Sequence, residues 1–128
     1  MNILRGKIIS GIGDFSKKME SIPGLLNAYQ KKLGIKLFPG TLNIVLPEEY
    51  HIPQTALWLD KSEYGGTVSI HIVPCKIKDR KAFILRTENN ELGRGHHPKT
   101  IIEIATDVRI RDTYDLSDGD ELEVVIQD

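Results

Sequence analysis

The stretch that decides the fold is residues 39–46, Pro-Gly-Thr-Leu-Asn-Ile-Val-Leu, which predicts a tight turn leading directly into a β-strand. Because strand side chains alternate between two faces, Leu42, Ile44 and Leu46 should point together toward the core. The same alternation places Thr41 and Asn43 side by side on the opposite face, at the start of the strand.

Thr41 and Asn43 would present a hydroxyl and an amide oxygen to the same side. Two neutral oxygens can ligate a hard cation, and Mg²⁺ is usually held by few protein oxygens together with substrate phosphates. The alternative is purely structural, because threonine is a good strand former and asparagine is common near turns. This stretch by itself leaves both interpretations open.

The composition is that of a globular protein with one domain. The chain has 128 residues, of which 40% are hydrophobic and 27% charged, enough to bury a core without disulfides. Its 17 basic residues are balanced by 18 acidic ones, which gives no basic footprint for nucleic acid or an anionic membrane. We therefore expect a single domain over residues 1–128, a monomer without nucleic-acid or membrane partners.

Cysteine content and the N-terminus bear on the compartment. The single cysteine, Cys75, excludes an internal disulfide and a cysteine-cluster metal site. The first six residues are too short and polar for a signal peptide, and no apolar run approaches the length of a membrane span. These features predict a cytoplasmic protein.

A second polar segment follows the first predicted strand, Ile3–Ser10. Residues 10–16, Ser-Gly-Ile-Gly-Asp-Phe-Ser, contain two glycines one residue apart, so that successive amides can point inward as an anion-binding nest. The segment lacks the third glycine of a dinucleotide fingerprint and the end of a P-loop. A tight turn at the exit of a strand is an equally good interpretation.

The remaining pattern predicts a barrel with one helix. Leu25, Tyr29 and Leu33 form an apolar stripe ending at Gly34, which predicts a short amphipathic helix over Pro23–Leu33. Further strands are expected at 56–59, at 67–77 with a break at Pro74, at 82–86, at 101–105 and at 121–126, with a charged turn at 78–81. Short antiparallel strands with turns between them favour a mainly β fold closed into a barrel.

Three further features could carry chemistry. The polar loop 88–98 contains His96 and His97, but adjacent side chains point apart on extended backbone, so a substrate-facing or solvated loop is favoured over a metal site. Glu103 interrupts an apolar run and either faces solvent at an edge or points into a site. Arg109 and Arg111 are two residues apart and could project together, as guanidinium groups that bind phosphate do.

Six short motifs occur in one order along the chain. They are Ser-Gly-Ile-Gly-Asp (10–14), Leu-Gly (33–34), Pro-Gly-Thr-Leu-Asn (39–43), Ile-Ile-Glu-Ile-Ala (101–105), Arg-Ile-Arg-Asp (109–112) and Leu-Ser-Asp-Gly-Asp (116–120). Together they resemble the archaeal-type, CTP-dependent riboflavin kinase family over 4–126. The resemblance implies a compact six-stranded β-barrel of the cradle-loop kind. It also implies transfer of the terminal phosphate of CTP to the ribityl 5'-hydroxyl of riboflavin, giving FMN and CDP.

Carried over by position, the resemblance implies a complete site. Thr41 and Asn43 would hold Mg²⁺, and the flavin would contact Glu103, Gly95 and His96. The nucleotide would be bound by Gly11, Ile12, Gly13, Asp14, Phe15, Ser16, Val108, Arg109, Ile110 and Arg111. Glu103 and Asp14 are the candidate acceptors for the hydroxyl proton. The family pattern has a threonine near Gly95, where this chain reads Arg-Gly-His-His, so the chain departs from it there.

Two other classes of function remain as alternatives. A barrel that binds a flavin or nucleotide as a sensor, without turnover, should have lost Thr41 and Asn43, which this chain keeps. A DNA-binding barrel should show clustered basic residues, which the charge balance does not favour. Some members of the family carry a fused N-terminal helix-turn-helix domain; the barrel motifs fill this sequence, so we expect no transcriptional role.

Overall fold

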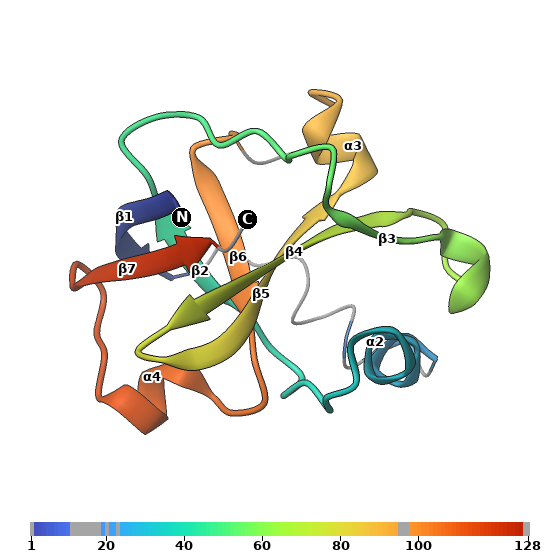
Figure 1. The fold of residues 1–128 in the computed structure, drawn as a ribbon, viewed down its shortest axis with the longest axis horizontal. Coiled ribbons are helices and arrows are strands. Elements are labelled where there is room, and N and C mark those ends of the chain that lie inside the picture. Colours follow the sequence, from blue (N-terminus) through green and yellow to red (C-terminus); the bar gives the residue numbers. More distant parts are fainter. Residues whose placement is uncertain (1, 11–18, 20, 23, 95–97, 127–128) are drawn as a thin grey trace.

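A computed structural model of the chain describes residues 2–10, 19, 21–22, 24–94 and 98–126. Within these residues one antiparallel sheet is built from seven strands: β1 (Asn2–Ile9), β2 (Leu42–Val45), β3 (Leu57–Leu59), β4 (Ile70–Ile77), β5 (Arg80–Thr87), β6 (Ile101–Ala105) and β7 (Glu121–Ile126). The strand order is β3-β4-β5-β6-β2-β1-β7, and β7 also pairs with β4 (Figure 1). This last pairing closes six strands into a barrel, as predicted, while β3 extends β4 outside it.

The first and last strands, β1 and β7, are neighbours in the barrel, and their pairing runs from Asn2 opposite Ile126 to Lys7 opposite Glu121. Beyond this ladder, the Ile8 amide donates to the Asp120 carbonyl over 3.0 Å and the Gly119 amide to the Ile8 carbonyl over 2.8 Å. The turn before β7 is therefore fastened to the end of β1.

The predicted amphipathic helix is present as α2 (Leu25–Leu33). Its Leu25, Tyr29 and Leu33 are buried, and Gly34 ends it at a φ of 79°, a left-handed conformation that suits glycine. Two further short helices, α3 (Glu88–Glu91) and α4 (Ile110–Tyr114), and a 3₁₀ turn η1 (Lys61–Glu63) are also formed, which the sequence did not predict. Segments of three to five residues are too short to show a helical period in the sequence.

The strands separate two hydrophobic cores. The barrel interior contains alternate residues of the strands, among them Ile44, Ile84, Ile104 and Val124. A second core lies between α2 and the outer face of the barrel, and it includes Tyr29, Phe83 and Leu85. Strand β5 is thus buried on both faces, because Ile84 points inward while its neighbours Phe83 and Leu85 meet α2. Figure 1 shows α2 nearly end-on beside the barrel.

Strand β4 runs through Pro74 without the predicted break. Pro74 lies opposite Phe83 of β5, while on the other edge β3 pairs only with Ile70–Ile72 and β7 only with Cys75 and Lys76. The proline therefore occupies the place where β4 changes partners, and its missing amide interrupts no pairing there. The turn to β5 consists of Lys78 and Asp79, both at positive φ, as a two-residue hairpin requires.

Within the described ranges no helix has the length and apolar character needed to cross a bilayer. Cys75 is a free, buried thiol on β4.

Candidate functional site

The polar centre of the molecule lies on the outer face of β2 and β6. Asn43 is paired with Glu103 across these strands, and their neighbours Ile44 and Ile104 point into the barrel interior. Asn43 and Glu103 are both only 7% exposed. The Thr41 hydroxyl donates to the Glu103 carboxylate over 2.9 Å. Of the two positions considered for Glu103, the structure places it in a buried cluster and not at a solvated edge.

The oxygens of this cluster suit a hard cation. The Asn43 side-chain oxygen Oδ1 is buried and has no hydrogen-bond partner in the described part of the chain. An unpaired buried acceptor costs free energy, so it is a natural ligand position for an ion or a donor group that binds from outside. Among the same residues there is no group of three histidine, cysteine or acidic side chains that could hold a metal. The donor set is therefore one amide, one hydroxyl and one nearby carboxylate, the oxygen chemistry that Mg²⁺ prefers.

A cavity of about 270 Å³ adjoins the cluster. Two segments line it, the turn before β2 and the start of α4: Phe38, Pro39, Gly40, Thr41, Leu42, Val108, Arg109, Ile110 and Arg111. The Phe38 amide donates to the Thr106 carbonyl over 2.8 Å, which holds the turn against the end of β6. The structure thus brings Thr41 and all four residues expected at 108–111 to one cavity.

Arg109 and Arg111 line the same cavity, but the backbone turns into α4 at Ile110 and their guanidinium groups bond different partners. Arg109 pairs with Asp112 of the same helix, Nη1 to Oδ1, at 2.8 Å. Arg111 instead reaches the end of β1, where Nη2 lies 2.9 Å from the Ser10 hydroxyl and 3.1 Å from the Ile9 carbonyl oxygen. The two guanidinium groups therefore serve different parts of the cavity rim.

Several expected site residues fall outside the described ranges. These are Gly11, Ile12, Gly13, Asp14, Phe15 and Ser16 of the first glycine segment and Gly95 and His96 of the polar loop. Their roles remain predictions. The described neighbours show where the two segments begin: Ser10 lies beside Arg111, and Arg94 and Pro98 flank the polar loop.

Tyr29 is a polar neighbour of the site that the sequence did not reveal. Its side chain is fully buried in the core under α2, and its hydroxyl has no hydrogen-bond partner among residues placed in the structure. Burial, followed by the negative potentials of Tyr64 and Glu103, raises the pKa of Tyr29 well above its ordinary value. The phenol is therefore protonated at neutral pH and can act as a hydrogen-bond donor. The sequence identified Tyr29 only as part of an apolar stripe.

We expect Tyr29→Phe to raise the free energy of unfolding by about 1 kcal/mol, since it removes a buried donor that makes no bond. Urea titration monitored by circular dichroism measures the change. Tyr64→Phe is the matched control, because the Tyr64 hydroxyl donates to the Val68 carbonyl and its removal should lower stability by a similar amount. Destabilisation by Tyr29→Phe equal to that of the control would contradict the unpaired state of the Tyr29 hydroxyl.

Arg86 makes buried tertiary contacts that could not be predicted from its place in a strand. It is 3% exposed, and its guanidinium donates to the Glu91 carboxylate at 2.9 Å and to the carbonyl oxygens of Tyr50, Lys99 and Ile101. The other Glu91 oxygen accepts from the Ile52 amide at 3.3 Å. This buried cation ties β5 to α3, to the segment after β2 and to the start of β6.

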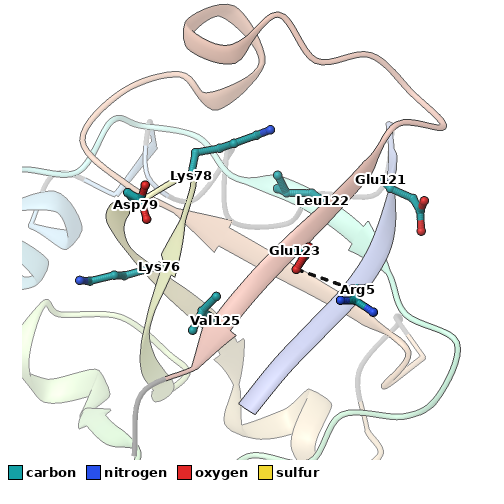
Figure 2. Close-up of a pocket in the computed structure, with 8 residues that line it drawn as sticks. All are labelled: Arg5, Lys76, Lys78, Asp79, Glu121, Leu122, Glu123 and Val125. Atoms are coloured by element: carbon teal, nitrogen blue, oxygen red, sulfur yellow. Dashed lines mark ion pairs between the residues drawn. The ribbon is translucent and has the colours of Figure 1, made fainter. Parts of the chain in front are cut away.

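A larger cavity of about 630 Å³ lies elsewhere, on the outer face of β1, β4 and β7. Figure 2 shows its charged lining, which has both signs: Arg5, Lys76, Lys78, Asp79, Glu121 and Glu123. Arg5 and Glu123 pair at 3.6 Å, with more than half of each side chain exposed. The cavity contains none of the expected site residues, and its mixed charge is typical of a solvated strand face.

Comparison with known proteins identifies the family of the chain. The model of a family labelled CTP-dep_RFKase, described as domain of unknown function DUF120, matches residues 8–126. The chain is 31% identical to riboflavin kinase from Methanocella arvoryzae, over 98% of this chain and 57% of that protein. It is 35% identical to riboflavin kinase from Pyrobaculum aerophilum, over 96% and 60%, and 30% identical to that from Staphylothermus marinus, over 98% and 92%.

The first two relatives are longer proteins, of which this chain spans less than two thirds. The family match nevertheless covers both segments of the cavity and the cluster on β2 and β6. On these grounds the chain belongs to the CTP-dependent riboflavin kinase family.

Proposed function

We propose that this protein transfers the terminal phosphate of CTP to the ribityl 5'-hydroxyl of riboflavin, giving FMN and CDP. The observation that carries the proposal is the junction between the cavity and the polar cluster. Thr41 lines the cavity and contacts Glu103, and Asn43 offers a buried unpaired oxygen next to them. The relatives' name, riboflavin kinase, supports riboflavin as the acceptor, and the family label supports CTP as the donor.

The nucleotide would occupy the cavity between residues 38–42 and 108–111. Arg109 and Arg111 would supply cationic donors to its phosphates, and the amides of 11–16 would add a nest for the group being transferred. Phosphoryl transfer does not require the protein to form a covalent bond with the substrates. Alignment of the two substrates and neutralisation of charge therefore account for most of the rate acceleration.

Thr41 and Asn43 would hold Mg²⁺ at the inner end of the cavity. When bound, the ion neutralises phosphate oxygens and orients them for displacement. Glu103 accepts a hydrogen bond from the Thr41 hydroxyl, which fixes the orientation of that side chain. The Glu103 carboxylate would contact the flavin, and Glu103 and Asp14 are the groups we propose to test as acceptors for the hydroxyl proton.

The experiment is a direct assay of the purified chain with riboflavin, Mg²⁺ and either CTP or ATP, with FMN separated by chromatography. We expect FMN and CDP with CTP and no FMN with ATP. FMN with ATP alone would remove CTP as the donor but keep the kinase. Tight binding of flavin or nucleotide without FMN would replace the kinase by a sensor.

A further inference from the structure

We infer that Asp118 is a positioning residue for nucleotide binding, which anchors Arg111 by one nitrogen and thereby presents its remaining donors to a phosphate in the cavity. The inference rests on the proposed function, since it assigns the anion at the Arg111 side of the cavity to a nucleotide. Asp118 belongs to the turn before β7 and lines no part of that cavity.

The anchor is a compact group of three side chains. Arg111 Nη2 lies 2.7 Å from Asp118 Oδ1, and the Ser10 hydroxyl donates to the same oxygen over 2.7 Å. Arg111 Nη2 also lies 2.9 Å from that hydroxyl. These hydrogen bonds, first from Ser10 and then from Arg111, lower the pKa of Asp118, so the carboxylate is charged at neutral pH. The end of β1, helix α4 and the turn before β7 are therefore joined through Arg111 Nη2.

Arg111 contacts the described part of the protein through a single guanidinium nitrogen. All the hydrogen bonds that Arg111 makes within the described ranges start from Nη2, which leaves Nε and Nη1 without a protein partner there. Arginine has five N–H donors in a rigid plane, and those on Nε and Nη1 point to different edges of the group, so each can donate a single hydrogen bond to a phosphate oxygen. With Nη2 fixed and the side chain lining the cavity, the free donors are preorganised for an anion.

The Asp118 carboxylate contributes little to the fold. Its side chain is 56% exposed and that of Arg111 23% exposed, and exposed ion pairs stabilise proteins only weakly. The turn that carries Asp118 is held by other bonds, namely the backbone contacts of Gly119 and Asp120 with Ile8, and the Ser117 amide on the Asp120 carboxylate at 2.8 Å. Removing the carboxylate should therefore release Arg111 without unfolding the turn.

The test compares Asp118→Ala and Asp118→Asn with Glu123→Gln, a remote acidic residue in the Arg5 pair shown in Figure 2. The measurements are the Kd of CDP by calorimetry, kcat, and KM for each substrate. We expect Asp118→Ala to raise the Kd of CDP and KM for CTP about fivefold to tenfold, because binding must then immobilise a mobile arginine. Asp118→Asn, which keeps an acceptor, should fall between.

A positioning role affects only nucleotide binding, whereas a general structural defect would also change kcat, KM for riboflavin and the melting temperature. In Asp118→Ala we expect kcat, KM for riboflavin and the melting temperature to stay close to those of the wild type, as in Glu123→Gln. In an Arg111→Ala background, Asp118→Ala should cause no further loss of CDP affinity, because the carboxylate acts through Arg111. Three results would each overturn the inference: unchanged CDP affinity, tighter binding, or a loss that persists in the Arg111→Ala background.

Failure of this inference can be told from failure of the proposed function. If the wild type makes FMN while Asp118→Ala binds CDP normally, the kinase stands and the anchor is refuted. If the wild type makes no FMN but binds CDP, and Asp118→Ala weakens that binding, the anchor stands and the kinase is refuted. A wild type that neither makes FMN nor binds CDP would refute both.

Discussion

Asn43→Ala is expected to lower kcat by about 100-fold or more, the order of loss seen when one preorganised group that stabilises charge is removed from an active site. The Asn43 oxygen has no protein partner within the described ranges, so its removal breaks no hydrogen bond of that oxygen. The melting temperature should therefore stay near that of the wild type. Steady-state FMN formation at several Mg²⁺ concentrations measures the effect, and the concentration of Mg²⁺ giving half-maximal rate should rise.

Asn90→Ala is the matched control for this prediction. Asn90 on α3 is 8% exposed, and its side-chain oxygen is likewise buried without a partner in the described part of the chain, but it lies outside the cluster on β2 and β6. Its kcat should stay close to that of the wild type. Equal activity of Asn43→Ala and Asn90→Ala would show that Asn43 holds no ion needed for turnover.

Arg86→Ala should lower the free energy of unfolding by about 3–5 kcal/mol, the range expected when one partner of a buried ion pair is removed. The reason is that Glu91 and three backbone carbonyls lose their common donor inside the protein. Urea unfolding gives the difference. If the alanine variant does not fold, Glu91→Gln is the milder test, since it weakens the same network and keeps its shape.

Arg80→Ala is the control for Arg86, because Arg80 also has an acidic partner, Asp107 at 2.6 Å, and donates to the Tyr114 hydroxyl at 2.8 Å. About a third of its side chain is exposed, so its loss should cost about 1 kcal/mol or less. Equal destabilisation by the two alanine variants would contradict the special role assigned to burial at Arg86.

Much of the fold was predictable because its strands have strong local patterns. Two strands, Ile101–Ala105 and Glu121–Ile126, have the bounds expected from alternation and apolar runs, and α2 ends at the predicted glycine. The exceptions have physical causes. The helices α3 and α4 are too short to leave a period, and Pro74 is tolerated in β4 only because of how two other strands pair with it.

The candidate site was predictable in part. The alternation of side chains placed Thr41 and Asn43 on one face, and the structure confirms that the core residues of the same strand point the other way. It could not place Glu103, which is 62 positions from Thr41 and meets it only through the register of β2 against β6. The partners of Arg86 and Arg111 could not be predicted for the same reason, because these residues come together through tertiary contacts that no local sequence pattern encodes.

The pairing of β1 with β7 has a consequence for the order of folding. A barrel in which the first strand pairs with the last cannot be completed on the ribosome until β7 has emerged. The edge of β1 that faces β7 therefore stays unpaired while the chain between them is synthesised. The β4–β5 hairpin needs only a two-residue turn and can form early. Pairing between strands so distant in sequence is slow, so final assembly of the barrel should be limited by the search of β7 for β1.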